Sequence, residues 1–157
     1  MNARPVLVSS CLAGMPCRYD GNARPDPTIV EAVRAGRAIP ACAEQLGDLP
    51  TPRPPAEIVG GDGGDVLDGT AAVIDIHGKD VSAPFVRGAE IVADIAAKRG
   101  ITEAVLQARS PSCGCGTVYD GSHSGELVSG DGVLTALLKR RGIRVTPVRG
   151  ARDPERS

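Results

Sequence analysis

Three cysteines each stand where an apolar, strand-like run of the sequence gives way to a turn. They are Cys11, Cys42 and Cys113. The carboxyl ends of parallel strands meet at one edge of a sheet, and open α/β folds bind their ligands there. Thiolates bind soft metals and iron–sulfur clusters. The positions therefore predict that three thiols far apart in sequence converge on one metal ion or cluster, although a small buried cysteine can also be an inert core residue.

Polar residues lie close to these cysteines along the chain. Glu44 follows Cys42 by two positions, and the Pro-rich segment after it carries Arg53. Such a segment is often a plain connector, but its stiffness would also fix the directions of Glu44 and Arg53, as a reacting site requires. Arg18 lies in the loop after Cys11. We predict that Arg18 and Arg53 hold a polar group of a substrate; the alternative is that they form solvated pairs with nearby acidic residues.

The segment from Ser110 to Gly116 reads Ser-Pro-Ser-Cys-Gly-Cys-Gly and is the most unusual stretch of the chain. Its glycines allow backbone amides to face a sulfur atom or an anion, and amide donors to sulfur tune clusters. The same segment leaves two other interpretations open. Cys113 and Cys115 could form a redox pair or carry a persulfide, and Cys17 or Cys115 could be a fourth metal ligand. His77 and His123 have no metal-binding spacing, and we expect both to be exposed.

Composition limits the classes of function. The chain has 157 residues, a net charge of −1, 2% aromatic residues and five cysteines. This balance provides neither the positive surface nor the stacking platform of a nucleic-acid-binding protein, so we expect no nucleic-acid partner. No run reaches transmembrane length and the amino terminus lacks a signal-peptide pattern, so we expect a cytoplasmic protein without a membrane partner. In a reducing compartment, cysteines favour metal ligation or thiol chemistry over disulfides. We expect a monomer or a weak homodimer.

The pattern of helix and strand signals predicts one α/β domain over residues 1–149 and a flexible tail over 150–157. Helices are expected from Pro27 to about Ala35 with Asp26 as cap, from 83 to 99, and from the cap Asp131 to about 141. Strands are expected at 5–10, 38–41, 104–108 and 143–148. We expect two Gly-rich stretches to form hairpins. The first comprises 60–69, with 60–64 as a flexible turn, and the following 71–76; the second comprises 117–130. This alternation predicts three layers, with a mainly parallel sheet, helices on its faces and Gly-rich hairpin insertions.

The three cysteine blocks, together with Tyr-Asp-Gly at 119–121 and Gly-Asp-Gly-Val-Leu-Thr-Ala-Leu-Leu at 130–138, resemble the thiouracil desulfidase family, formerly a domain of unknown function. The resemblance runs from about Pro5 to Val148. It implies a 4Fe-4S cluster that is held by Cys11, Cys42 and Cys113 and has one open iron.

The resemblance also implies roles for residues beside the cluster. Its acidic residue falls on Glu44 and its catalytic serine on Ser110, with Ser112 as the second candidate and a substrate-binding position. The chain departs from the family at Ala43, where proline is usual, and at Gln107, where lysine is common. The second departure allows a different substrate.

An enzyme of this family would remove sulfur from a thiolated pyrimidine such as 2-thiouracil. Coordination to the open iron would polarise the C=S bond, Glu44 would activate water, and the products would be uracil and hydrogen sulfide without net electron transfer. The competing hypothesis is a non-catalytic module in which zinc or an iron–sulfur cluster stabilises the edge of the sheet. Such a structural metal site needs a fourth ligand.

Overall fold

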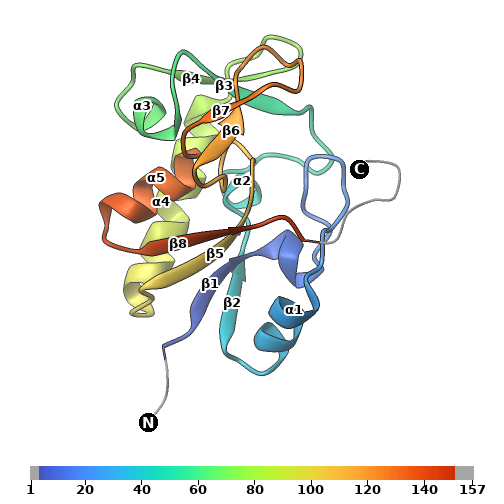
Figure 1. Ribbon diagram of the computed structural model, residues 1–157, viewed down its shortest axis with the longest axis vertical. Coiled ribbons are helices and arrows are strands. Elements are labelled where there is room, and N and C mark those ends of the chain that lie inside the picture. Colours follow the sequence, from blue (N-terminus) through green and yellow to red (C-terminus); the bar gives the residue numbers. More distant parts are fainter. Residues whose placement is uncertain (1–3, 151–157) are drawn as a thin grey trace.

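A four-stranded parallel sheet forms the centre of the computed structural model, which describes residues 4–150 (Figure 1). The strand order is β2-β1-β5-β8. The strands are β1 Val6–Ser9, β2 Ala38–Ala41, β5 Glu103–Gln107 and β8 Arg144–Val148. All four lie where the sequence predicts strands. Pro40, which cannot donate a ladder hydrogen bond, is tolerated because β2 is at the edge of the sheet.

Helices cover both faces of this sheet, so the predicted three-layer arrangement is confirmed. One face packs against α4 (Ser82–Lys98) and α5 (Val133–Arg140), and the other against α1 (Pro27–Arg34). Neighbouring residues of a strand point to opposite faces. Accordingly, Leu7 of β1 joins the core with α4 and α5, whereas Val8 joins a second core with Ile29 of α1.

The helix caps differ in how well the sequence predicts them. Asp26 caps α1 as predicted, because its Oδ1 accepts hydrogen bonds from the backbone N–H groups of Thr28 and Ile29. Asp131 was predicted to cap α5, and this is wrong: the cap residue is Gly132. The Asp131 carboxylate is used elsewhere, since it accepts a hydrogen bond from the Gly116 N–H at 2.8 Å and pairs with Lys139 at 3.0 Å.

Two insertions follow the sheet strands and form antiparallel hairpins on the same side of the molecule (Figure 1). The first contains β3 (Ala56–Val59) and β4 (Ala72–Asp75), and the second contains β6 (Thr117–Tyr119) and β7 (Leu127–Ser129). The prediction of a flexible turn at 60–64 is wrong. Asp62 begins α3 (Gly63–Leu67) there with a reciprocal capping box to Asp65, which satisfies the orphan donors of the first turn.

Two short elements that position the site were not predicted. They are a 3-10 turn, η1 (Ser10–Ala13), and α2 (Ala43–Leu46). α2 packs so closely on α4 that a Cβ at Gly88 would overlap the carbonyl oxygen of Ala43. Helix α4 therefore fixes α2 through a glycine contact. Within residues 4–150, no helix is long and apolar enough to cross a membrane. Most of the predicted tail, residues 151–157, lies outside the described residues.

Candidate active site

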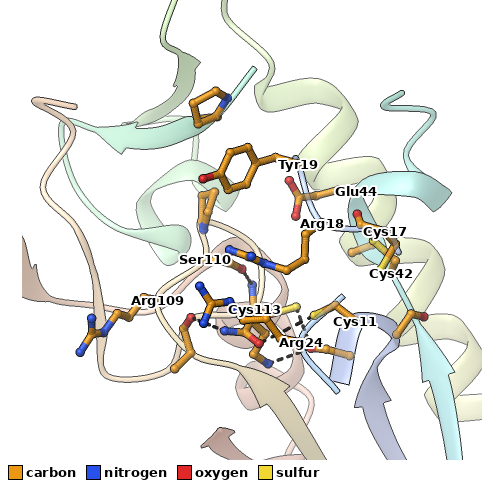
Figure 2. A pocket seen from close by; sticks show the side chains of 18 of the residues that line it. Cys11, Cys17, Arg18, Tyr19, Arg24, Cys42, Glu44, Arg109, Ser110 and Cys113 are labelled. Carbon is orange, nitrogen blue, oxygen red and sulfur yellow. Dashed lines mark hydrogen bonds between the residues drawn. The ribbon is translucent and has the colours of Figure 1, made fainter. Parts of the chain in front are cut away.

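A cavity of about 450 Å³ lies between the carboxyl ends of the parallel strands and the two hairpins (Figure 2). Its floor comes from the ends of β1, β2 and β5 and the loops that follow them. Its roof comes from β3 and from β6 with the loop after it, which contribute Glu57, Tyr119 and Gly125. The cavity therefore lies where ligands bind in open α/β sheets.

The structure brings Cys11, Cys42 and Cys113 to this one cavity, as their positions in the sequence predict. Cys11 lies in η1 directly after β1, Cys42 is the N-cap of α2 directly after β2, and Cys113 lies in the loop after β5. Cys11 and Cys113 are buried, and Cys42 is half-buried. Their role as cluster ligands stays a prediction.

Hydrogen bonds orient the sulfur atoms. The Ser9 hydroxyl accepts the Gln107 backbone N–H at 2.9 Å and donates to the Cys113 sulfur at 3.3 Å. The Cys11 thiol lies 3.8 Å from Oε1 of Gln107. The Cys42 thiol donates to the Cys17 carbonyl at 3.9 Å. The ends of β1 and β5 therefore supply polar partners to Cys113 and Cys11, and the loop after η1 supplies one to Cys42.

The protein environment alone favours the protonated form of two of these thiols, Cys113 and Cys42. Burial raises the pKa of Cys113 to about 12, against the opposing effect of the Ser9 hydrogen bond. The pKa of Cys42 is also raised, mainly through its hydrogen bond with the Cys17 side chain and then through burial. A thiol ligand must lose its proton to bind a metal, so a positive centre is what would hold these groups as thiolates.

The donor set fits a cluster better than a single ion. Among residues 4–150, no three His, Cys, Asp or Glu side chains come close enough to hold one metal ion. Thiolates that bind different corners of a cluster attach to different iron atoms and need not converge on one point. Three thiols spaced around one cavity therefore suit a multi-iron cluster.

The two remaining cysteines lie in different places. Cys17 lines the cavity and hydrogen bonds to the Cys11 side chain, which is the main cause that raises the pKa of Cys17 to about 12. Cys115 is not among the lining residues, and its thiol donates to the carbonyl of Val145 in β8 at 3.7 Å. Of the two candidates for a fourth thiol, Cys17 is the one that shares the cavity.

Glu44 lines the cavity from α2, and Arg53 holds it there. The Arg53 Nε lies 3.2 Å from Oε1 of Glu44, and its side chain is only 4% exposed. The same guanidinium donates to the carbonyls of Pro50 and Cys17 and to the Thr51 hydroxyl. Arg53 itself is not on the cavity wall. The structure therefore supports the predicted stiff aim of Glu44 and places Arg53 as its support rather than as a substrate contact.

Arg18 does line the cavity, but it also has protein partners. Its Nη1 lies 3.4 Å from Asp20, and its guanidinium carbon lies 5.5 Å from the centre of the Tyr19 ring. The pair with an acidic residue is therefore present, and the substrate contact of Arg18 stays a prediction. The ion pair and ring contact hold this cation at the cavity wall.

The two serines of the third block differ in position. Ser110 lines the cavity, and its Oγ accepts the backbone N–H groups of Cys113 at 2.6 Å and Ser112 at 3.2 Å. With its lone pairs used by the backbone, the hydroxyl proton of Ser110 is left to donate. Ser112 is 1% exposed and does not line the cavity, so its predicted place in a substrate-binding wall is wrong.

Several residues line the cavity although no motif in the sequence points to them. They are Glu57, Arg24, Arg109 and Arg149. Arg109 has a φ of 72° directly before Ser110, but backbone strain of this kind leaves no mark on the sequence. His77 is exposed as predicted. The prediction that His123 is exposed is wrong, because its Nδ1 lies 3.7 Å from Oε2 of Glu57 with a side chain 21% exposed.

Comparisons with known proteins agree with this architecture. The family model described as 2-thiouracil desulfurase matches residues 6–148. An uncharacterized protein of Bacillus subtilis (strain 168), YbbK, is 44% identical over 140 residues, which are 89% of this chain and 93% of that protein. A solved structure described as the 4Fe-4S-dependent thiouracil desulfidase TudS superposes with a TM-score of 0.81 at 40% identity, covering 92% of this chain and 91% of that chain. The chain therefore belongs to the 2-thiouracil desulfurase family of enzymes.

Proposed function

We propose that this enzyme removes the sulfur of a thiolated pyrimidine such as 2-thiouracil by hydrolysis, giving uracil and hydrogen sulfide. The observation that carries the proposal is the convergence of Cys11, Cys42, Cys113 and Glu44 on one cavity. Family membership and the similarity to a 4Fe-4S-dependent thiouracil desulfidase support it. The volume of about 450 Å³ lies within the ordinary range for small-molecule sites.

The proposed cofactor is a 4Fe-4S cluster on Cys11, Cys42 and Cys113. With three protein ligands it would retain one open iron, which would supply a soft Lewis acid that polarises a thiocarbonyl. Ser9 would donate to the Cys113 thiolate, and hydrogen bonds of this type to ligand sulfur tune a cluster.

Glu44 is the proposed general base. Arg53 engages Oε1, which leaves Oε2 to take a proton from the water that attacks the C=S carbon. One C–O bond forms, the C–S bond breaks, and sulfur leaves with protons that came from water. Oxidation states do not change, so no electron donor is needed.

Ser110 is the proposed orienting group. Its oxygen is held by two backbone N–H groups, so the hydroxyl proton is directed away from the loop and is available to a ring atom of the substrate or to the departing sulfur. Arg18 is proposed to face the carbonyl side of the ring from the mouth of the cavity.

A second candidate function is a non-catalytic metal module with four thiolates. The observation that favours it is Cys17, which lies in the cavity beside Cys11 and Cys42. If Cys17 were a fourth ligand, Cys17→Ser would lose the cluster. If the desulfidase proposal holds, Cys17→Ser retains it.

The test is anaerobic reconstitution with iron and sulfide, followed by a visible spectrum and incubation with 2-thiouracil. We expect the broad absorption of a 4Fe-4S cluster, and uracil and sulfide in equal amounts by chromatography and a sulfide assay. Cys115→Ser is the matched control, because Cys115 lies outside the cavity. A cluster-loaded protein that leaves 2-thiouracil and its thiolated analogues intact would contradict the proposal.

A further inference from the structure

A second carboxylate lines the cavity in the roof and has no place in the chemistry above. Glu57 belongs to β3, and its side chain is 12% exposed. Both of its oxygens face the loop 120–126 that joins β6 to β7. Oε1 accepts the backbone N–H groups of Gly121 at 2.9 Å and His123 at 3.1 Å, and Oε2 lies 3.7 Å from the His123 imidazole.

The loop that Glu57 holds is part of the cavity wall. Tyr119 at its start and Gly125 near its end both line the cavity. The loop also lies directly against β3, because a Cβ at Gly121 would come within 2.6 Å of the Ile58 carbonyl oxygen. Its backbone is fixed in unusual conformations there, with φ of 94° at Gly121 and 58° at His123. A positive φ is ordinary for glycine but uncommon for other residues, so the hydrogen bond to Glu57 helps to hold the His123 conformation.

From these contacts we propose that Glu57 is a positioning residue that fastens the loop 120–126 over the cavity and so sets how tightly the substrate is held. Oε1 already accepts two backbone N–H groups of the loop and Oε2 lies toward the His123 imidazole, so Glu57 acts through the loop and not as a base. A carboxylate that accepts backbone N–H groups makes charge-assisted hydrogen bonds, which are stronger than neutral ones. The inference about substrate rests on the proposed function; the inference about the loop does not.

The first measurement is hydrogen exchange of the backbone amides in the reconstituted holoenzyme, resolved for Gly121 and His123. In Glu57→Ala both amides lose their acceptor, and their exchange should accelerate on the order of tenfold to a hundredfold. Glu57→Gln keeps an oxygen at the same reach, so it should restore most of the protection. Glu126→Ala is the matched control, because Glu126 is an exposed glutamate in the same loop whose main-chain carbonyl bonds to Asp120.

The second measurement is steady-state desulfidation by the same variants. Glu57→Ala should raise KM roughly tenfold and leave kcat within about twofold, since the reacting groups are on the opposite wall. Glu57→Gln and Glu126→Ala should both match the wild type. His123→Asn, which keeps the main-chain bonds and tolerates a positive φ, should have a smaller effect than Glu57→Ala.

Each outcome is decisive. Unchanged exchange at Gly121 and His123 in Glu57→Ala would overturn the proposal, and so would a loss of kcat in Glu57→Gln with normal protection, which would make Glu57 a reacting group. If Glu57→Ala does not fold, Glu57→Gln still tests this point. If the wild type has no desulfidase activity, the proposed function fails while the exchange data still decide whether Glu57 fastens the loop.

Discussion

The floor and the roof of the cavity each carry one half-buried carboxylate, and the two are used differently. Glu44 on the floor has one oxygen engaged by a single side chain, that of Arg53. Glu57 in the roof is engaged through both oxygens, and two of its three partners are backbone N–H groups. A carboxylate held through one oxygen by a side chain can take a proton on the other, whereas one that accepts two backbone N–H groups and faces a histidine with its second oxygen holds structure. Floor substitutions should therefore change kcat, and roof substitutions should change substrate binding or stability.

The largest effect is expected from removal of a floor thiol. Cys11→Ala, Cys42→Ala or Cys113→Ala should each lose the cluster and lower desulfidation by more than about a hundredfold, because replacing a residue that only hydrogen-bonds to a metal ligand already costs ten- to a hundredfold in metal affinity or activity. Iron content and the visible spectrum measure the first effect, and sulfide release measures the second. Cys115→Ser should behave like the wild type. A loss of activity in Cys115→Ser would instead favour a Cys113–Cys115 redox pair.

The next effect separates the two carboxylates directly. Glu44→Gln removes the proposed base without changing its size, so kcat should fall roughly 10²- to 10⁴-fold while the cluster spectrum stays the same. Glu57→Gln is the matched substitution in the roof and should leave kcat within about twofold. Similar losses of kcat in the two variants would mean that both walls take part in the chemistry and that the two carboxylates do not differ in role.

A smaller effect is expected at the support of Glu44. Arg53→Lys keeps the charge, but lysine cannot hydrogen-bond to Glu44 and to the carbonyls of Pro50 and Cys17 at the same time. The Glu44 carboxylate should therefore lose its fixed orientation. We expect kcat to fall about tenfold with the cluster retained, because a misdirected catalytic group costs rate even when it is present. Arg34→Lys, at an exposed arginine of α1, is the control. A raised KM with normal kcat would show that Arg53 serves binding instead.

The sequence predicts the floor far better than the roof, for a physical reason. Each floor thiol follows a continuous apolar strand, and strand ends of a parallel sheet meet by geometry, so Cys11, Cys42 and Cys113 can be placed from local pattern alone. The roof depends instead on contacts between residues far apart in the sequence. The hydrogen bond between Glu57 and Gly121 spans 64 positions and joins two separate insertions, and no local pattern encodes it.

The same distinction explains the incorrect predictions about individual elements. Asp131 has the sequence signature of a helix cap, but Gly116 and Lys139 take its carboxylate, and neither neighbour can be inferred from the residues beside it. The prediction of a flexible turn at 60–64 fails because glycine is a poor helix former, whereas the capping box between Asp62 and Asp65 is what starts α3 there. Ser112 resembles Ser110 in sequence, and only the path of the loop buries one and exposes the other to the cavity.

The smallest effect tests whether the roof acts as one unit. Asp62 caps α3 through bonds to the N–H groups of Gly64 and Asp65, and its Oδ2 also accepts the Asp131 N–H at 3.3 Å. Asp62→Ala should lower the free energy of unfolding by about 1 kcal/mol, the usual cost of a lost N-cap, and Asp62→Asn should restore most of it. Chemical denaturation measures both. KM should stay near the wild-type value, because Glu57 and the loop 120–126 do not depend on α3. If instead Asp62→Ala raises KM as much as Glu57→Ala, the two insertions move together and the roof is a single cooperative body.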